Sequence, residues 1–178
     1  MTATISTRKI IGWATSCILI IMLCTAAFVT VVHARTMKMN ARMVFHIIKS
    51  EVVEVGDKPG HYVGYIHNGG LLTMADGEVG KTEGWYTIDY TNGTGTFSGY
   101  GKTTFDDGST QLTRVEKGNT KATQGGKVSL LSGELEYVGG TGRFKGIKGT
   151  GTFSGKRITP VEVGADAYND ITGTITLP

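Results

Sequence analysis

Apolar or small residues alternate with polar ones along most of the chain. The clearest case is residues 147–155, where Ile147, Gly149, Gly151, Phe153 and Gly155 share one face and lysine, threonine and serine occupy the other. An alternation with a period of two predicts a half-buried β-strand. The seven residues Gly-Thr-Gly-Thr-Phe-Ser-Gly at 149–155 also occur at 93–99, so we expect a similar strand there.

Comparable segments follow one another with turn residues between them. The expected strands cover residues 44–55, 61–66, 71–75, 83–90, 93–105, 110–116, 127–138, 147–155 and 168–177. We expect turns at 56–60, 76–77 and 106–109, with residues 67–70 connecting two short strands. A polar loop is expected at 118–126 and a longer loop at 159–167. About eight strands at this spacing predict a sandwich or a barrel. A barrel is favoured because closure removes edge strands, and because repeated glycines suit the bends of a small barrel.

The N-terminal segment has a different pattern. Arg8 and Lys9 precede an apolar run over residues 10–32, with small residues before a break. This order is typical of a secretory signal, with cleavage after Ala27 or after Ala34. The alternative is an uncleaved apolar helix that anchors the protein in the membrane, since the run is long enough to span a bilayer. We therefore expect an exported protein, periplasmic or extracellular, with membrane anchoring through residues 10–32 as the alternative.

These boundaries divide the chain into a signal or anchor at residues 1–34, a flexible lead-in at 35–43 and a barrel domain at 44–178.

The whole chain has 18 basic and 15 acidic residues, and removing residues 1–34 takes away Arg8 and Lys9. The nearly balanced charge that is left gives no electrostatic case for nucleic acid or for an anionic membrane surface. Both cysteines, Cys17 and Cys24, are lost as well, so the mature part has no thiolate metal site.

A family resemblance rests on a glycine-rich hairpin, Tyr-Val-Gly-Gly-Thr-Gly-Arg-Phe-Lys-Gly-Ile-Lys-Gly at residues 137–149. It resembles the late hairpin of the allene oxide cyclase and dirigent barrels. Together with residues 57–61, 76–78 and 104–110, it is similar to small exported bacterial proteins with an allene-oxide-cyclase-like barrel. The resemblance implies an all-β, antiparallel eight-stranded barrel of the calycin type, often oligomeric, with an apolar cavity. Plant members cyclise an epoxy fatty acid or steer radical coupling, but their catalytic residues do not align with this chain, and the catalytic residues stay unknown.

Several polar and aromatic residues are candidates for a ligand site. His61, with Asp57 and Glu78, would form an acid–base cluster at a barrel mouth; the alternative is that His61 caps a turn and Glu78 faces water. The aromatic residues Trp85, Tyr86, Tyr90 and Tyr137 would line a cavity, with ordinary core packing as the alternative. The predicted ligand-binding residues are His61, Glu78, Trp85, Tyr90 and Tyr137.

Other motifs point to no cofactor and no metal. Two Gly-x-Gly-x-x-x-Gly segments, at 93–99 and 140–146, are one residue too long for a dinucleotide fingerprint, and no helix follows them. The histidines lack a recognised zinc spacing. Asn92 begins a glycosylation sequon, which is relevant only in a eukaryotic host.

Glycine beside aromatic residues, for example Gly95 and Gly99 beside Phe97, leaves volume that either neighbouring side chains or a ligand must fill.

We therefore expect an exported barrel that binds a small hydrophobic molecule. The first alternative is a cofactor-free isomerase or cyclase that shapes a flexible substrate, and the second is a structural or assembly protein with a filled barrel. Fold alone does not choose among them. The expected partner is the small hydrophobic ligand, without nucleic acid, with the membrane contacted only through the N-terminal segment, and with a homo-oligomer left open.

Overall fold

The computed structural model describes residues 34–159 and 165–178, so the predicted N-terminal helix and its cleavage sites lie outside the described residues. The described part contains eight β-strands and two short 3-10 helices. The strands are β1 (Arg35–Glu54), β2 (His61–Met74), β3 (Val79–Thr91), β4 (Thr94–Phe105), β5 (Thr110–Thr123), β6 (Val128–Thr141), β7 (Lys148–Arg157) and β8 (Ala167–Leu177). The helices are η1 (Gln124–Gly126) and η2 (Gly142–Phe144).

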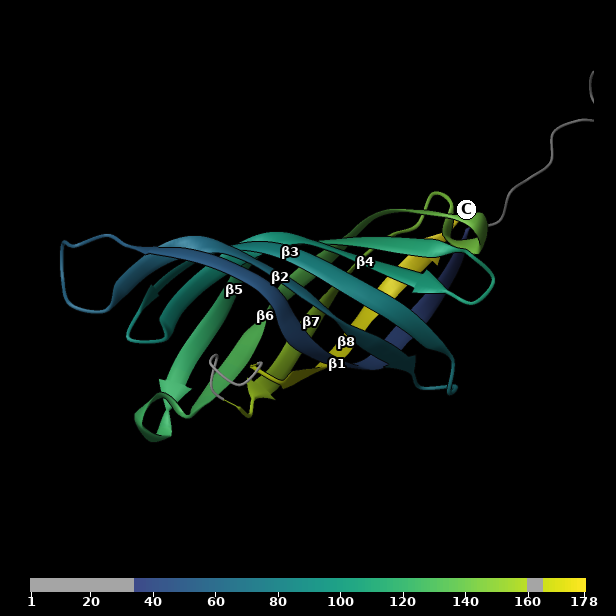
Figure 1. The fold of residues 1–178 in the computed structure, drawn as a ribbon. Coiled ribbons are helices and arrows are strands. Elements are labelled where there is room, and N and C mark those ends of the chain that lie inside the picture. The colour runs from purple at the N-terminus through teal and green to yellow at the C-terminus, as the bar shows by residue number, and fades with distance from the viewer. Residues whose placement is uncertain (1–33, 160–164) are drawn as a thin grey trace, which may run out of the picture. The chain divides into compact units, whose positions relative to one another are not determined.

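Every strand pairs with the next in antiparallel register, and β1 also pairs with β8, so the sheet closes on itself as a barrel (Figure 1). The β1–β8 ladder runs from Arg35 opposite Leu177 to Phe45 opposite Ala167. The predicted fold class is confirmed as eight antiparallel strands in a ring. The predicted alternation is also confirmed, because Ile147, Gly151 and Phe153 are buried while Lys148, Thr150 and Thr152 are exposed.

The flexible lead-in expected at residues 35–43 is wrong, because these residues form the half of β1 that closes the ring. Their side chains continue the inward alternation of the strand. Met39 is only 2% exposed, and Met37, Ala41 and Met43 pack against the same core. The methionines are flexible, polarizable side chains that fill irregular core space well. Burial of this apolar face therefore holds the segment in the sheet.

Two other boundaries differ from the sequence-based prediction. The strands expected at 61–66 and 71–75 are one strand, β2, which passes through Gly69 and Gly70 without a turn. A side chain at Gly70 would collide with the backbone of Val44 and Phe45, so close strand approach explains this glycine. The polar loop expected at 118–126 is wrong over 118–123, because β5 continues to Thr123 after a register shift between Arg114 and Gly118.

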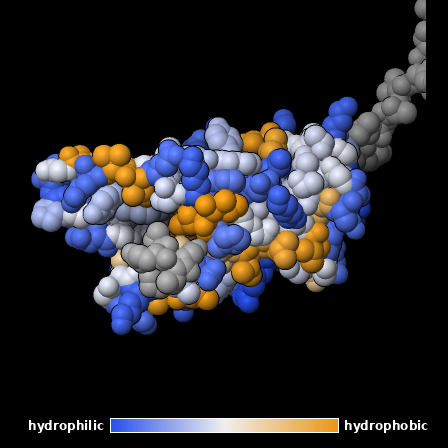
Figure 2. All heavy atoms as spheres, in the orientation of Figure 1, coloured by the Kyte–Doolittle hydropathy of each residue, from blue (hydrophilic) through white to orange (hydrophobic). Residues whose placement is uncertain are grey.

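The barrel has two different ends. The first end carries the β2–β3 and β4–β5 turns and η2, and the second end carries the β1–β2, β3–β4 and β5–β6 connections. Figure 1 shows the β1–β2 and β3–β4 hairpins extending at the second end, away from the C-terminus. Val52, Val53 and Val55 are exposed near the tip of the β1–β2 hairpin, and Figure 2 shows hydrophobic residues in this region.

The first end is closed by packed side chains. Met39, Phe105, Phe144, Ile147 and Ile175 are all buried in the hydrophobic core, and the Phe105 and Phe144 rings lie 5.1 Å apart. The Arg143 guanidinium covers both rings, with its central carbon 4.8 Å from each ring centroid. Arg143 also pairs with Glu78, and its backbone N–H donates to Ser109 Oγ at 3.1 Å. The glycine-rich hairpin of the sequence therefore seals one end of the barrel.

Candidate functional site

A cavity of about 100 Å³ lies inside the barrel. Every strand contributes to its wall. The apolar and aromatic lining residues include Phe45, Ile66, Leu72, Phe97, Val115, Leu131, Leu135, Phe153 and Ile171. A cavity needs room for only about one probe sphere to hold a water molecule, so this one exceeds the size of a single water. The size and lining are suited to a small, mostly apolar molecule.

Part of the volume left by the strand glycines is filled by aromatic rings. Phe97 stands opposite Gly118 on β5, and Phe153 stands opposite Gly133 on β6. A Cβ atom at either glycine would overlap the facing ring. The two rings lie 6.0 Å apart and both line the cavity. Neighbouring side chains therefore take up much of the space that the sequence left open, and a smaller cavity remains beside them.

The polar side chains of the lining are hydroxyls and carboxamides. They are Asn68, Thr82, Thr103, Gln111, Thr113 and Asn169, with the hydroxyls of Tyr86, Tyr90 and Tyr137. Burial raises the pKa of Tyr86 to about 12, and burial also raises the pKa of Tyr137. The pKa of Tyr90 is also raised by burial, although the hydrogen bond from Thr120 opposes the shift. All three phenols are therefore protonated and neutral near pH 7.

Some of these polar groups bind one another. Thr103 Oγ1 donates to Thr82 Oγ1 at 3.4 Å, and Thr82 Oγ1 donates to Met43 Sδ at 3.8 Å. Thr120 Oγ1 donates to the Tyr90 hydroxyl oxygen at 3.1 Å, which leaves the Tyr90 hydrogen free for another acceptor. The wall thus contains a short chain of hydrogen bonds from β4 through β3 to β1, and a pair that links β3 to β5.

Two carboxamides in the cavity wall are less well satisfied. Gln111 is 3% exposed and Asn169 is 6% exposed. Among the described residues, neither Gln111 Nε2 nor Asn169 Oδ1 has a hydrogen-bond partner. Buried polar atoms are nearly always paired, because an unpaired one loses about 1–3 kcal/mol of solvation without compensation. These atoms offer one free donor and one free acceptor to whatever occupies the cavity.

The five residues predicted to bind a ligand do not lie in one site. Tyr90 and Tyr137 line the cavity. Trp85 faces outward, where its ring stacks on His67 at 5.3 Å and adjoins a surface groove beside Tyr65 and Tyr100. The alternation explains this difference, because Tyr86 and Tyr90 share the inward face of β3 while Trp85 belongs to the opposite face.

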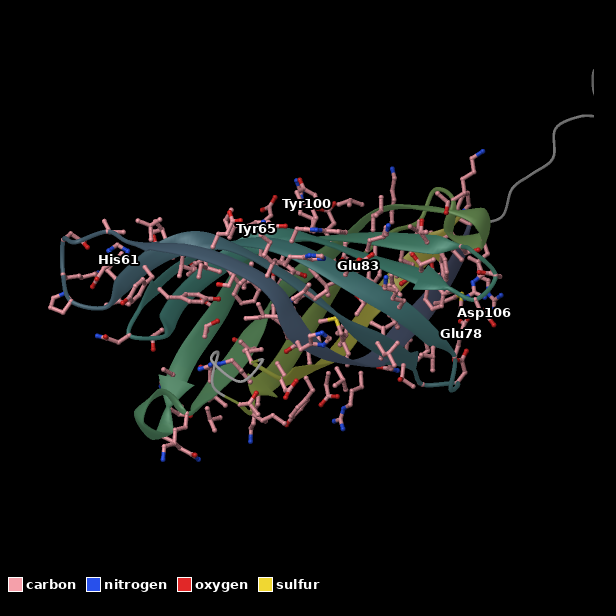
Figure 3. All side chains as sticks on the ribbon, in the orientation of Figure 1. His61, Tyr65, Glu78, Glu83, Tyr100 and Asp106 are labelled. Carbon is pink, nitrogen blue, oxygen red and sulfur yellow. The ribbon has the colours of Figure 1, made fainter. Side chains whose placement is uncertain are left out.

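His61 and Glu78 lie at opposite ends of the barrel (Figure 3). The expected cluster of both residues at one mouth is therefore wrong. At the second end, His61 Nδ1 lies 2.5 Å from Asp57 Oδ1, as expected, and His61 Nε2 lies 3.0 Å from Asp89 Oδ1. The two carboxylates raise the pKa of His61, Asp57 more than Asp89, and the pKa of Asp57 is lowered. Glu78 instead pairs with Arg143 at the first end.

Sequence reasoning did not select Gln111 or Asn169. Asn169 shares a face with Ile171, Gly173 and Ile175, so continuing the predicted β8 alternation by one step would have placed it inside. Gln111 is the second residue of β5 and stands among threonines, where no apolar pattern marks the inward face. Its burial follows from pairing with Thr103 on β4 and Gly140 on β6, which the sequence alone does not specify.

Within residues 34–159 and 165–178, no group of three or more His, Cys, Asp or Glu side chains is placed to hold a metal ion. In the same residues, no helix is long and apolar enough to cross a membrane.

The fold and the site together define an eight-stranded antiparallel barrel with a small internal cavity. No protein-family model matches the chain, and no curated protein matches it significantly. Among solved structures, the chain is similar to the pterocarpan synthase dirigent protein GePTS1, with a TM-score of 0.50 and 19% identity over 83% of this chain and 87% of that one. A second structure, the pterocarpan synthase dirigent protein PsPTS1, has a TM-score of 0.48 and 18% identity over 81% of this chain and 95% of that one. The predicted resemblance to dirigent-type barrels is confirmed at the level of the fold.

Proposed function

We propose that the protein binds a small hydrophobic molecule inside the barrel. The observation that carries this proposal is the cavity of about 100 Å³, which persists although Phe97 and Phe153 already fill the space beside Gly118 and Gly133. Apolar side chains supply most of the wall, and a few hydroxyls and carboxamides supply directional contacts. This combination is typical of pockets for small ligands.

The cavity volume sets the size of the first probe. A molecule with one aromatic ring, such as p-xylene, is a test ligand at the upper limit of size. Benzene is bound by apolar cavities of about 150 Å³, so p-xylene fits here only by extending toward the side on which the cavity is open. We expect p-xylene to bind the folded barrel at one saturable site, with NMR shifts confined to residues of the cavity wall. An absence of saturable binding would contradict the proposal.

Two adjacent leucines on β6 provide a matched pair of variants. Leu131 lines the cavity, whereas Leu130 points outward and is 41% exposed. Leu131→Phe should fill the cavity and weaken p-xylene binding, and Leu130→Phe should leave the affinity unchanged. Equal affinities of the two variants would place the binding site elsewhere on the molecule.

We further propose that the barrel acts outside the cytoplasm after removal of an N-terminal signal. Arg8 and Lys9 before the apolar run support this proposal. N-terminal sequencing of the mature protein should begin at Phe28 or Arg35. Because Arg35 is the first residue of β1, both products retain the strand that closes the ring. Recovery of the full-length chain in the membrane fraction would favour the anchor instead.

A further inference from the structure

We propose that the cavity selects an uncharged ligand that carries a hydrogen-bond acceptor at one side and a donor at the other. Gln111 would donate to the acceptor of the ligand, and Asn169 would accept from its donor. This inference rests on the proposed binding function and adds the chemical class of the ligand. It follows from the unpartnered atoms of two deeply buried carboxamides and from the uncharged character of the cavity wall.

The two carboxamides offer opposite hydrogen-bonding groups. Gln111 Nε2 carries hydrogens and has no acceptor among the described residues, while Asn169 Oδ1 accepts and has no donor among them. A ligand satisfies both only if it presents an acceptor to Gln111 and a donor to Asn169. Each bond made to a buried group also relieves the desolvation of that group, so the pair favours polar ligands over purely apolar ones of the same shape.

The two groups project from different parts of the wall. Gln111 follows the β4–β5 turn at the first end, whereas Asn169 is the third residue of β8, which starts at the second end. Asn169 is held beside Gly155, where a Cβ atom would overlap its Oδ1. The acceptor and donor of the ligand therefore belong on separate sides of its ring rather than on adjacent atoms.

The charge of the wall restricts the ligand further. Every residue that lines the cavity in the described part of the chain has an uncharged side chain at pH 7, because phenols are already protonated at that pH and burial only raises their pKa. A carboxylate in this cavity would lose its hydration without meeting a lining cation, which is strongly unfavourable. Arg157, whose charge reaches Tyr90, is not among the lining residues and instead donates to Ser129 Oγ and to the carbonyls of Gly126 and Thr159. The cavity therefore discriminates against anionic ligands, including the ionised head of a fatty acid.

Three ring compounds of similar size test this inference with the unmodified protein. 4-Hydroxybenzamide is neutral and carries a donor and an acceptor at opposite sides of its ring, 4-hydroxybenzoate is its anionic counterpart at pH 7, and p-xylene is apolar. Calorimetry or NMR titration would give the three affinities. We expect 4-hydroxybenzoate to bind at least about 100-fold more weakly than 4-hydroxybenzamide, because its charge is buried unpaired. Equal affinities of these two compounds would overturn the inference.

Variants at the two carboxamides give a second, independent measurement. Gln111→Leu and Asn169→Leu should each weaken 4-hydroxybenzamide by roughly 2- to 10-fold, the value of one hydrogen bond. Each should leave p-xylene binding unchanged or slightly tighter, which also shows that the variant is folded. If p-xylene binds the parent but both variants keep the parental affinity for 4-hydroxybenzamide, the inference is wrong while the binding function stands. If none of the three compounds binds the parent, both proposals are wrong.

Discussion

The Phe97 ring on β4 occupies the space that a side chain at Gly118 on β5 would need. The two residues are cross-strand partners, and a Cβ atom at Gly118 would overlap the ring itself. The same relationship recurs between Phe153 and Gly133 on β7 and β6. Glycine on one strand and phenylalanine on the next therefore form a unit, in which the ring covers exposed backbone and gains a flat surface to pack on.

This relationship predicts that Gly118→Ala destabilises the barrel. The added methyl group must displace the Phe97 ring, and such overpacking lowers the free energy of unfolding by about 1–3 kcal/mol. Gly139→Ala is a suitable control, because Gly139 also lies in a strand but the nearest atom to its Cβ position is 3.8 Å away. Urea unfolding of the two variants would measure the difference. Equal stabilities would show that the Phe97 ring moves without loss.

The His61 cluster predicts a pH-dependent stability. Asp57 and Asp89 raise the pKa of His61 above its ordinary value of 6.5. The protonated ring is therefore favoured in the folded protein. Its contribution is fully present below about pH 6.5 and is lost as the pH rises through the raised pKa. The pKa of Asp57 is lowered, so its contribution is present above about pH 3.8 and is lost as the pH falls through the lowered pKa.

We expect His61→Gln to destabilise the protein more at about pH 6 than at about pH 9. Thermal unfolding at both pH values would measure this difference, and NMR titration of the ring would report the raised pKa directly. His46→Gln, at an exposed position of β1, is the control. A destabilisation by His61→Gln that is the same at both pH values would contradict the expectation.

Because the Arg143 guanidinium covers Phe105 and Phe144 at the first end of the barrel, we expect Arg143→Lys to lower stability. Lysine keeps the charge near Glu78 but loses the planar guanidinium that lies over Phe105 and Phe144. We expect a loss of about 1 kcal/mol in the free energy of unfolding, because Arg143 is partly exposed and each contact contributes about 0.5–1 kcal/mol at exposed sites. Arg35→Lys, at the exposed start of β1, should change stability by only a few tenths of a kcal/mol. If Arg143→Lys and Arg35→Lys changed the free energy of unfolding equally, the role of Arg143 would be purely electrostatic.

The sequence pattern predicts the ring of strands well but the site only in part. Alternation identifies inward residues wherever apolar and polar side chains differ clearly, as at Ile147 and Phe153. It is less informative where polar residues face inward, because a buried Gln111 and an exposed threonine look alike in sequence. Closure also brings residues together according to strand register, so His61 meets Asp89 from the neighbouring strand rather than Glu78. Register depends on bulges such as the shift between Arg114 and Gly118, which the local sequence does not specify.

We expect Tyr90→Phe to affect both stability and ligand binding, and the two effects can be measured separately. Its hydroxyl oxygen accepts a bond from Thr120, a residue that is only 7% exposed. Tyr90→Phe should lower the free energy of unfolding by about 1 kcal/mol, because the Thr120 hydroxyl loses its partner. Thr120→Val removes the other partner, so the double variant should be less destabilised than the sum of the two single changes. Strict additivity, measured by urea unfolding, would contradict the bond.

The binding effect of the same change depends on the Tyr90 hydrogen, which Thr120 leaves free. We expect that hydrogen to reach the ligand, so Tyr90→Phe should weaken 4-hydroxybenzamide by the roughly 0.5–1.5 kcal/mol of one hydrogen bond, and p-xylene should keep its affinity. Thr120→Val is the matched control, because it breaks the same internal bond but leaves the Tyr90 hydroxyl in place. Loss of affinity in Tyr90→Phe but not in Thr120→Val would show that the hydroxyl contacts the ligand. An equal loss in both variants would mean that the bond between these residues only shapes the cavity wall.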